Sequence, residues 1–431
     1  MCSKIFVYEF ISGGGFNNIK IPSSLFCEGF GMLRSIVDDF KYLDLEVISL
    51  LDNRIRFLSE ILDIDSIKYV ESEDDYKKEF LSRVKESEYC FIIAPEFSNI
   101  LSELSQIVIK NNKKLLSVNL KGIEIASSKY KTYKYFLSHH LKTPETYLIP
   151  LKNEYPLKKY IIDKFKQIGA PIIIKPDDGV GAESIIKIEN ESELNRLLDN
   201  FESSFEKGRN YIIQKFIRGK NSSISLLNSI KKEKRIKPII LSINTQNIQI
   251  NETNKASEYL GGETPIEKFE EKKRLLEKIL KKVKFTEFGG LYGIDFILKD
   301  TEIFFLEINP RLTTSYIGIR KILTKNPVKF LMNLSGFNQN YKVRIIGTSI
   351  FTRIELIYSG PLFEKKLKEE LIPEMEKKFP EFITPPIAFD DNRNQYSCFV
   401  ATKEKSLTKS REKIASIKSY LQKKDFIIKS N

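Results

Sequence analysis

Residues 289–316 read GGLYGIDFILKDTEIFFLEINPRLTTSY, a pattern typical of two short strands joined by a polar turn. Apolar residues alternate with polar ones in GIDFIL and in EIFFLEI. Asp295 lies on the first strand. Glu307 and Asn309 share one face of the second, because side chains two apart on a strand point the same way. The pattern predicts a hairpin from which carboxylate and amide oxygens converge.

Such a set of oxygen donors suits a divalent cation. Mg²⁺ binds a few carboxylates together with phosphate oxygens and water, and Asp295, Glu307 and Asn309 would supply the protein ligands. Arg311 follows directly, and its planar guanidinium can bind a phosphate or a carboxylate. The alternative is an exposed polar hairpin edge without a ligand, and the rest of the chain favours the metal interpretation.

The composition predicts a globular protein of two or three domains. Of the 431 residues, 41% are hydrophobic and 29% charged, and no apolar run approaches the roughly 20 residues of a membrane span. The first residues lack the charged and apolar regions of an export signal. The four cysteines lie far apart, which argues against a disulfide framework or a zinc site and favours the reducing cytoplasm.

The net charge of +13 points to an anionic partner. The lysines are dispersed among Glu and Asp on predicted polar helix faces, and arginines are few. Attraction of small anionic substrates therefore explains the charge more simply than nucleic-acid binding. The only histidines are His139 and His140, which argues against catalysis or metal binding that depends on histidine. The pattern specifies no oligomeric state.

The first part of the chain alternates apolar strands with helical segments. The strand patterns are KIFVYEF, LEVISLL, YCFIIA and LLSVNL, and they predict a parallel α/β domain over residues 1–125. A Gly13–Gly15 turn follows the first strand, at the edge where parallel sheets bind ligands. It lacks the GxGxxG spacing of a dinucleotide site, and a plain flexible turn is an equal alternative.

Residues 171–188, PIIIKPDDGVGAESIIKI, predict a strand, a glycine-containing loop and a second strand. The first strand carries Lys175. Gly179 and Gly181 permit the backbone of the loop to approach a ligand closely. Because no helix follows, a mobile flap over phosphate groups fits better than a Rossmann turn. An ordinary glycine hairpin is the structural alternative.

The next strand, YIIQKFIRG, ends at a glycine and offers a backbone edge that can pair with an adenine ring. Gln214 lies on this strand and is available to the adenine amino group. Further on, a helix is expected over residues 266–285. Beyond the hairpin we expect two strands in 343–360, a helix over 363–379, a loop over 380–386, a strand near 396–401 and a helix over 407–422.

A strand lysine, a glycine flap, an adenine-edge strand and an Asp…Glu-x-Asn hairpin follow one another in this chain. In that order they resemble the ATP-grasp superfamily, whose enzymes join a carboxylate to an amine through an acyl-phosphate. The resemblance implies an α/β and α+β architecture with an N-terminal parallel α/β pre-ATP-grasp domain and a C-terminal α+β extension. The expected divisions are 1–125, 126–335 (small lobe about 145–215, large lobe about 216–335) and 336–431.

The resemblance also implies roles for individual residues. Lys175 and Lys129 would hold the α- and β-phosphates of ATP, and Gly179, Gly181 and Ala182 would cover the γ-phosphate. Lys220 departs from the family pattern, since many relatives place an acid there, near the ribose. The remaining implied ligands are Gln214, Lys215 and Ile217 for adenine, and Asp295, Glu307 and Asn309 for two Mg²⁺ or Mn²⁺ ions.

A narrower resemblance rests on EFISGGG, CEGFGMLRSIVDDF and EINPRLTTSYIGIR, which are similar to the tyramine–glutamate ligase family associated with methanofuran biosynthesis. It implies small-molecule substrates, an amide between the γ-carboxylate of glutamate and the amine of tyramine, and a catalytic Arg311. Backbone N–H groups near Gly289–Gly290 are further candidates to stabilise the oxyanion. Residues 313–316, TTSY, would bind the amino acid together with Arg311, unless their hydroxyls merely cap the next helix.

Two other classes of function remain open. One is a different ATP-grasp enzyme, such as an amino-acid ligase or a carboxylase-like enzyme with another acceptor, although the chain has no biotinylated domain. The other is a non-catalytic nucleotide-binding or basic RNA-binding protein. The intact Asp295, Glu307 and Asn309 argue against the second class, because binding alone tolerates the loss of metal ligands.

Overall fold

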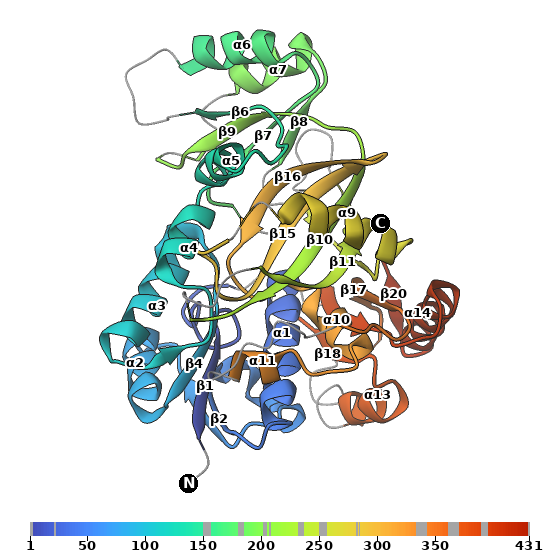
Figure 1. Cartoon of the computed structure of the whole chain (residues 1–431). Coiled ribbons are helices and arrows are strands. Elements are labelled where there is room, and N and C mark those ends of the chain that lie inside the picture. The colour runs from blue at the N-terminus through green and yellow to red at the C-terminus, as the bar shows by residue number, and fades with distance from the viewer. Residues whose placement is uncertain are drawn as a thin grey trace.

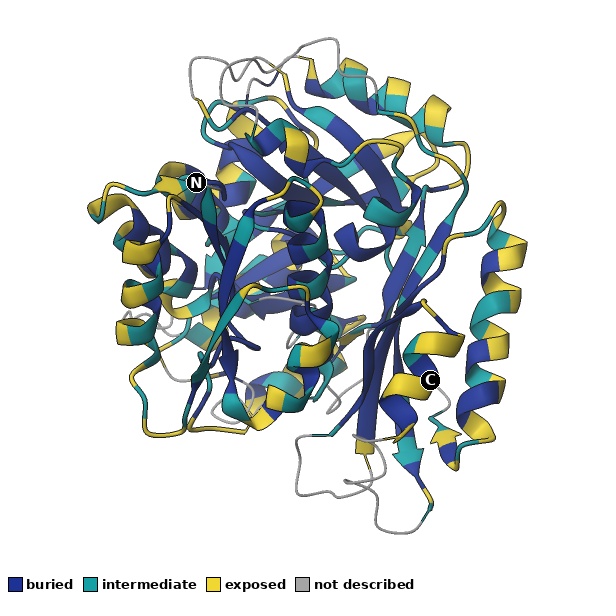
Figure 2. Ribbon diagram, turned by 90° about the horizontal axis from the view of Figure 1, so that it is seen from below, coloured by how far each residue is buried: buried dark blue, intermediate teal, exposed yellow. Residues whose placement is uncertain are grey.

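The computed structural model describes residues 3–20, 23–149, 157–179, 185–200, 205–206, 208–231, 237–249, 257–281, 283, 285–332, 343–360, 370–388 and 395–429. Four larger sheets lie side by side (Figure 1). A small sheet lies at the top of this view, a second lies beneath it, and the N-terminal and C-terminal sheets lie at the lower left and lower right. The outer helices turn their exposed residues to the outside, while the strands are mostly buried (Figure 2).

The N-terminal sheet is parallel throughout, with the order β3-β2-β1-β4-β5. Its central strands are almost continuously apolar, as expected where helices cover both faces. The predicted parallel domain is confirmed, although the expected strand LLSVNL is paired only at Lys114–Leu115. The strands are β1 (Lys4–Glu9), β2 (Glu46–Asp52), β3 (Ser66–Val70), β4 (Tyr89–Ile93) and β5 (Lys114–Leu115); the helices are α1 (Ser23–Lys41), α2 (Tyr76–Glu86), α3 (Ile100–Lys110) and α4 (Leu120–Ala126).

The Gly13–Gly15 turn is shaped by packing. A Cβ atom on Gly13 would come within 2.4 Å of the Tyr8 ring, and one on Gly15 within 2.3 Å of the Phe10 ring. Gly14 has a φ of +86°, which favours glycine. Glycine is therefore required for the turn to fold against its own strand, which favours the plain-turn alternative.

The small sheet is antiparallel, with the order β6-β9-β7-β8, and has a hydrophobic core of its own. Helices α6 and α7 cover its outer face in Figure 1, and α5 leads into it from below. The elements are α5 (Lys129–Ser138), β6 (Thr146–Ile149), α6 (Leu157–Ile168), β7 (Ile172–Pro176), β8 (Ile186–Ile188), α7 (Glu191–Asp199) and β9 (Tyr211–Lys215).

The sheet beneath it is antiparallel and has the order β11-β10-β15-β16. Strands β15 and β16 form the predicted hairpin. The expected alternation in β16 is wrong at one point, where Leu306 is an extra residue between two ladder pairs. The helix expected over 266–285 is shorter. The elements are β10 (Lys220–Asn228), β11 (Ile239–Thr245), β12 (Ile248–Gln249), β13 (Glu258–Tyr259), α9 (Phe269–Leu280), β15 (Gly290–Lys299), β16 (Glu302–Asn309), α10 (Tyr316–Ile322) and α11 (Val328–Met332).

The C-terminal sheet has the order β14-β17-β19-β18, with β20 also paired to β17. Two expectations are wrong here. Residues 343–360 contain one strand, not two, because the chain up to Thr348 makes only isolated bridges. The loop expected over 380–386 is the edge strand β18, where prolines are tolerated because one side of the strand needs no N–H donors. The elements are β14 (Gly261–Thr264), β17 (Ser349–Tyr358), α13 (Ile372–Lys378), β18 (Phe382–Ile387), β19 (Gln395–Ala401), α14 (Leu407–Gln422) and β20 (Phe426–Ile428).

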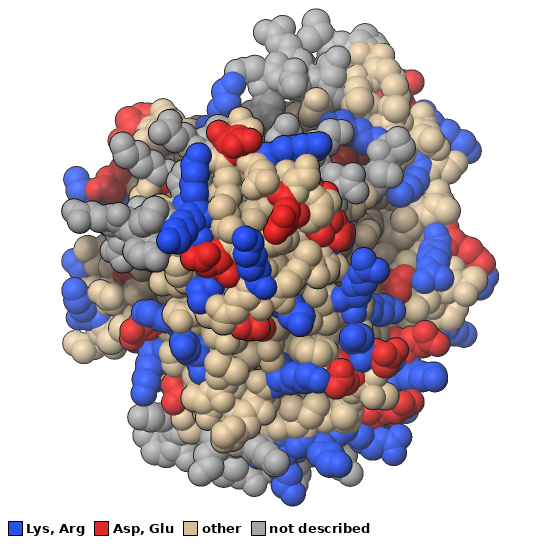
Figure 3. Space-filling view, turned by 90° about the horizontal axis from the view of Figure 1, so that it is seen from above, with Lys and Arg blue, Asp and Glu red and all other residues tan. Residues whose placement is uncertain are grey.

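Strand β14 precedes the hairpin in sequence yet pairs with β17. The C-terminal sheet is thus completed by a strand from the preceding region, and the domain boundaries at 125 and 335 remain a proposal. Among the described residues, no helix combines the length and apolarity that a bilayer crossing requires. On the face seen in Figure 3, basic side chains are interspersed with acidic ones.

Helix α1 is enclosed between the N-terminal and C-terminal sheets, and it packs on β1, β18 and β19. Most of its residues are buried, as expected for a helix covered on several sides. Two glycines permit the close packing. A Cβ on Gly29 would lie 2.7 Å from the Glu9 carboxyl group, and one on Gly31 would lie 3.0 Å from Ile317. Helix α1 therefore fixes the C-terminal part of the chain to the N-terminal part.

The far end of α1 carries an ion pair that holds α10. Asp39 accepts hydrogen bonds from Arg320 Nε at 3.0 Å, Arg320 Nη2 at 2.9 Å and the Tyr316 hydroxyl at 2.7 Å. Breaking such a buried pair leaves an uncompensated charge, at a cost of about 3 kcal/mol. We expect Arg320→Met to lower the thermal unfolding midpoint by roughly 5 °C in scanning calorimetry.

The matched control is Lys77→Met, which removes the exposed Lys77–Glu103 pair. An exposed pair contributes at most about 1 kcal/mol, so its midpoint should change much less. Equal shifts in the two variants would contradict the importance of the α1–α10 contact.

Candidate active site

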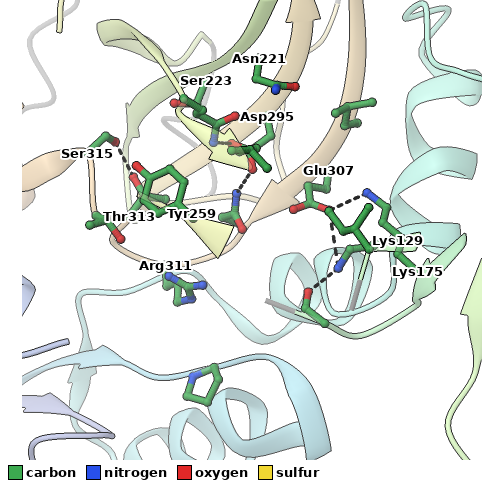
Figure 4. A pocket seen from close by; sticks show the side chains of 18 of the residues that line it. Lys129, Lys175, Asn221, Ser223, Tyr259, Asp295, Glu307, Arg311, Thr313 and Ser315 are labelled. Carbon is green, nitrogen blue, oxygen red and sulfur yellow. Dashed lines mark hydrogen bonds and ion pairs between the residues drawn. The ribbon is translucent and has the colours of Figure 1, made fainter. Parts of the chain in front are cut away.

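One pocket lies where the N-terminal sheet, the small sheet and the β15–β16 hairpin meet, and its polar side chains point inward (Figure 4). Gly181 and Ala182 lie outside the described residues. The residues predicted to bind ATP or metal ions, other than these two, all line this pocket together with Arg311, and their roles remain a prediction. They are Lys129, Lys175, Gly179, Gln214, Lys215, Ile217, Asp295, Glu307, Asn309 and Arg311.

Asp177, directly after β7, brings the two predicted phosphate-binding lysines together. Its backbone oxygen accepts the Lys129 N–H at 2.8 Å, and its Oδ1 accepts the Tyr130 N–H at 2.8 Å. Asp177 therefore satisfies free N–H groups in the first turn of α5, a favourable place for an anion. Lys129 lies at the start of α5 and Lys175 near the end of β7, so this contact sets both ammonium groups at the same wall.

Both ammonium groups face Glu307, which lies on the sheet β11-β10-β15-β16 opposite the small sheet. Glu307 Oε2 lies 3.5 Å from Lys129 Nζ and 3.4 Å from Lys175 Nζ, and Lys129 Nζ also donates to the Gly179 carbonyl oxygen (Figure 4). Burial opposes the charged form of Glu307, but the two lysines hold its pKa below the usual value. For Lys175, burial lowers the pKa and Glu307 opposes the shift.

The extra residue Leu306 determines which side chains face each other on the hairpin. It makes Asp295 the direct cross-strand partner of Glu307, and such bulges commonly redirect side chains near functional sites. Asp295 accepts hydrogen bonds from Gln246 Nε2 at 3.0 Å and from Asn309 Nδ2 at 3.1 Å. Burial raises the pKa of Asp295, and the neighbouring Glu307 carboxylate raises it further.

These residues fit a bound divalent cation. Two half-buried carboxylates that face each other repel, and a cation between them would remove this repulsion. Asp295, Glu307 and the Asn309 amide oxygen form a hard oxygen donor set of the kind Mg²⁺ prefers. Within the described ranges, no group of three or more His, Cys, Asp and Glu side chains could hold a metal by itself. A cation here would therefore complete its shell with phosphate oxygens and water.

Strand β9 reaches the pocket where the adenine edge is predicted, and this role remains a prediction. Gln214 is buried, and its Nε2 donates to Thr146 Oγ1 at 2.8 Å, which leaves its carbonyl oxygen to accept from an amino group. The Lys215 N–H is bonded to Glu145 O at 2.9 Å, and the strand ends directly afterwards. Gln214, Lys215 and Ile217 thus border the pocket at the end of β9.

Arg311 links the hairpin to the N-terminal sheet. Its Nε lies 3.1 Å from Glu96 Oε1 and 3.3 Å from Glu96 Oε2, and Glu96 follows β4. The expectation for Gly289–Gly290 is wrong. Gly290 is the first residue of β15, five residues before Asp295, and a Cβ there would meet Leu116 O at 2.9 Å; it does not line the pocket.

The hydroxyl groups after Arg311 divide into two sets. Thr313 and Ser315 bond each other at 2.9 Å, and Thr314 donates to Glu28 at 3.2 Å; all three line the pocket. Ser315 precedes α10 but makes no side-chain capping bond, so the helix-cap alternative is wrong for this residue. The expected substrate role of Tyr316 is also wrong, because its buried hydroxyl binds Asp39 on α1 and it does not line the pocket.

Sequence reasoning missed a second group of lining residues. Its acids are Glu9 and Glu28, and further polar residues come from β10 and the segments after β11. Glu96, which was also missed, holds the lining residue Arg311 in an ion pair. The available signals were an acid inside the apolar strand KIFVYEF, an acid directly after YCFIIAP, and polar residues two apart in NSSIS. The further polar residues are Asn221, Ser223, Gln246 and Tyr259.

Family models match most of the N-terminal two thirds of the chain. The model of the ATP-grasp domain matches residues 126–315, and the model of the pre ATP-grasp 3 domain matches residues 45–123. The first match covers the small sheet and the hairpin, and the second covers β2 to β5.

Two curated relatives match over much of their length. A tyramine–L-glutamate ligase of Methanocaldococcus fervens is 30% identical over 321 residues, which is 73% of this chain and 89% of the relative. A tyramine–L-glutamate ligase of Methanocaldococcus jannaschii is 29% identical over 349 residues, which is 80% of this chain and 92% of the relative.

Among solved structures, the biotin carboxylase domain of the 2-oxoglutarate carboxylase of Hydrogenobacter thermophilus superposes with a TM-score of 0.68. The match covers 100% of this chain and 91% of the carboxylase chain at 15% identity, so it shows a shared fold. That structure is described as a complex with MgADP, ADP and bicarbonate.

The hairpin geometry leads to a first test of the site. We expect Glu307→Ala and Asp295→Ala each to leave a folded protein whose ADP formation falls by at least ~10²-fold, the scale of losing one electrostatic stabiliser in a dry site. The matched control is Glu302→Ala. Glu302 is an exposed acid on the same strand β16, and it pairs with Lys142 away from the pocket. Retained ADP formation in the Glu307 and Asp295 variants would remove the hairpin from the chemistry.

Proposed function

The chain belongs to the tyramine–L-glutamate ligase family of ATP-grasp enzymes, and from this premise we propose that it joins the amine of tyramine to the γ-carboxylate of L-glutamate. It is an ADP-forming carboxylate–amine ligase, and its family uses ATP with Mg²⁺ or Mn²⁺. Tyramine and glutamate are the substrates named for the two relatives. For this chain they are our proposal, and small-molecule substrates fit a pocket of this kind.

The observation that carries the proposal is the convergence on Glu307. Lys129 and Lys175 from one side and the β15–β16 carboxylates from the other place fixed cations opposite metal-type ligands in one pocket. A nucleoside triphosphate needs both, because its phosphate charges must be neutralised while a cation bridges them. A pocket built for a neutral ligand would have no use for two lysines and two carboxylates, all at least half-buried, at this spacing.

In the proposed reaction, a γ-carboxylate oxygen of glutamate attacks the γ-phosphorus of ATP, and ADP leaves. The amine nitrogen, as the free base left after its ammonium form loses a proton to water, then attacks the acyl carbon. The bond from that carbon to the phosphate oxygen breaks, inorganic phosphate departs, and the nitrogen releases one more proton to give the neutral amide. Lys129 and Lys175 offset charge on the phosphates, and the strands hold the reactants in line. Burial of the site keeps water from the acyl-phosphate.

We propose that Asp295, Glu307 and Asn309 hold two Mg²⁺ or Mn²⁺ ions. When bound, such ions neutralise phosphate charge and orient the transferred phosphoryl group. Before ligands arrive, Lys129 and Lys175 compensate Glu307, and Gln246 and Asn309 hold Asp295.

Arg311 is the proposed contact for the glutamate carboxylate. Its Nε side is occupied by Glu96, and its Nη1 donates to the Leu312 carbonyl oxygen at 3.3 Å, so the guanidinium is fixed at the pocket wall. Figure 4 shows Arg311 among the lining residues. A fixed guanidinium presents two parallel N–H donors to a carboxylate, which a lysine cannot do. Thr313 lies two residues further along the same loop and lines the same pocket.

Two alternatives are less well supported. A carboxylase activity would rest on the fold alone, since the biotin carboxylase domain is 15% identical. A non-catalytic nucleotide-binding role would leave the half-buried Asp295–Glu307 pair without a use. A ligase with a different amine uses the same site and is separated from our proposal only by a substrate test.

The substrate test measures ADP release with ATP-Mg²⁺ and glutamate, with and without tyramine. We expect sustained ADP formation only when both substrates are present, and γ-glutamyltyramine as the product in mass spectrometry. Replacing tyramine by other primary amines tests the alternative acceptors. Turnover with another amine and none with tyramine would contradict the substrate proposal and leave the ligase assignment intact.

Arg311→Lys keeps the charge but loses the bidentate fork. We expect the KM for glutamate to rise by a factor corresponding to roughly 1–3 kcal/mol, the range for charge-assisted hydrogen bonds, while the KM for ATP changes little. The measurement is steady-state kinetics with tyramine saturating. An unchanged KM for glutamate would place the amino-acid site elsewhere in the pocket.

A further inference from the structure

Part of the same pocket, called the second chamber below, is lined by residues of the N-terminal sheet and α1 that the chemistry above does not use. This second chamber is lined by Glu9, Glu28, Met32, Ile93, Pro95 and Phe97. It lies at the carboxyl ends of β1 and β4, the neighbours in the sheet order β3-β2-β1-β4-β5 between which the order of the strands reverses. Parallel sheets bind ligands in the crevice at such a switch point.

The walls of this chamber combine an apolar surface with carboxylate groups. Glu9 and Glu28 line the pocket here, and the neighbouring cations are Arg311, which pairs with Glu96, and Arg353, which pairs with Glu28. Glu96 is 7% exposed, and its Oε1, although 3.1 Å from Arg311 Nε, makes no hydrogen bond to any described residue. Since Glu96 does not line the pocket and lies within an ion pair, it holds Arg311 in place and offers no site to a ligand.

The three carboxylates differ in what they can offer a ligand. Glu9 is 2% exposed, and its oxygens accept from the Ile11 N–H, the Ser12 N–H and the Ser12 hydroxyl within its own turn. Glu96 is tied to Arg311. The Glu28 side chain remains 15% exposed, so it presents its carboxylate to the chamber most openly.

Glu28 is held from two sides. Its Oε1 accepts from Arg353 Nη1 at 3.1 Å, and its Oε2 accepts from the Thr314 hydroxyl at 3.2 Å. Arg353 lies on β17, 325 residues further along the chain, and it is itself fixed by Glu258 and Glu355. Each Glu28 oxygen accepts one protein donor and keeps a further lone pair for a ligand.

The position of Glu28 links the second chamber to the site of phosphoryl transfer. Thr314 comes five residues after Asn309, so Glu28 meets the chain where it leaves the metal hairpin. Tyr259 lines the same pocket as Glu28 and Asp295. A group bound to Glu28 is therefore close to the phosphoryl-transfer site.

We propose that Glu28 binds the ammonium group of the amine substrate, that the apolar wall of Met32, Ile93 and Phe97 takes its aryl body, and that Arg353 is a positioning residue for Glu28. This inference rests on the proposed ligase function and names the site of its second substrate. It also gives the C-terminal sheet a role, because β17 supplies the residue that orients Glu28. The α-ammonium of the amino acid has the same chemistry but lacks the apolar body that the wall matches.

The test uses Glu28→Gln, which keeps the shape and the Thr314 contact but removes the charge. Arg353 retains Glu258 and Glu355, so the variant should fold. We expect the KM for tyramine to rise by about 10- to 100-fold, the range for a hydrogen bond to a charged group, with the KM values for glutamate and ATP within about 2-fold of wild type. An unchanged KM for tyramine, or an equal rise for glutamate, would overturn the assignment.

A neutral isostere separates charge recognition from packing. Tyrosol carries a hydroxyl where tyramine carries its ammonium, so its inhibition constant should be the same in wild type and Glu28→Gln. The matched control is Glu376→Gln, which breaks the Arg34–Glu376 pair between α1 and α13 outside the pocket. The control should leave the KM for tyramine unchanged, and a rise equal to that of Glu28→Gln would overturn the assignment.

Arg353 acts through Glu28 if its effect depends on that residue. We expect Arg353→Lys to raise the KM for tyramine about 3- to 10-fold in the wild-type background and not to raise it further in Glu28→Gln. Independent, multiplying effects in the double variant would contradict the positioning role.

A direct binding measurement separates failure of this inference from failure of the proposed function. If wild type does not turn over tyramine with glutamate, calorimetric titration of tyramine and tyrosol in the presence of a non-hydrolysable ATP analogue still tests the chamber. Binding of tyramine by wild type and its loss in Glu28→Gln would support an ammonium site. Absence of tyramine binding by wild type would overturn it.

Discussion

The site depends on compensation between charges that are at least half-buried and come from separate sheets. Glu307 on the hairpin lies within 3.5 Å of both Lys129 and Lys175. The lysines stabilise the ionised carboxylate and the carboxylate stabilises the ammonium groups, which offsets the free-energy cost of removing these charges from water. Asp177 makes this possible, because it ties the start of α5 to the end of β7 and sets both lysines at one wall. When a triphosphate and its cations bind, the lysines can contact phosphate oxygens and Glu307 can contact a cation in place of their contacts with each other. The charged groups need not move far for this exchange.

A second constraint comes from helix α1, which is shared by the N-terminal and C-terminal sheets. Gly29 and Gly31 let the helix approach Glu9 on one side and Ile317 on the other. The same helix carries Glu28, which Arg353 reaches from β17. The C-terminal sheet thus braces a wall of the pocket without lining it. In our proposal this wall receives the amine, while the hairpin and lysines receive ATP, so the two substrates enter from different sheets.

The features predicted correctly from the sequence are local. The hairpin, the strand lysine and the alternating N-terminal strands follow from periodicity over a few residues, and the combination identified the family. The features that were missed depend on distant parts of the chain. The Glu28–Arg353 pair joins residues 325 positions apart, the contact of Tyr316 with Asp39 depends on where α1 packs, and β18 is a strand because its prolines lie at a sheet edge. The extra residue Leu306 was missed because the run FFLEI is mostly apolar. Its sequence pattern therefore does not show which of its residues is left unpaired.

The central claim is that this pocket activates the γ-carboxylate of glutamate as an acyl-phosphate. The most direct test is an oxygen-transfer experiment with glutamate labelled with ¹⁸O in the γ-carboxylate, followed by ³¹P NMR of the phosphate released. Our account predicts one ¹⁸O atom in each inorganic phosphate, because the bond from the acyl carbon to the transferred oxygen breaks when the amine attacks. Unlabelled phosphate released along with amide product would contradict it.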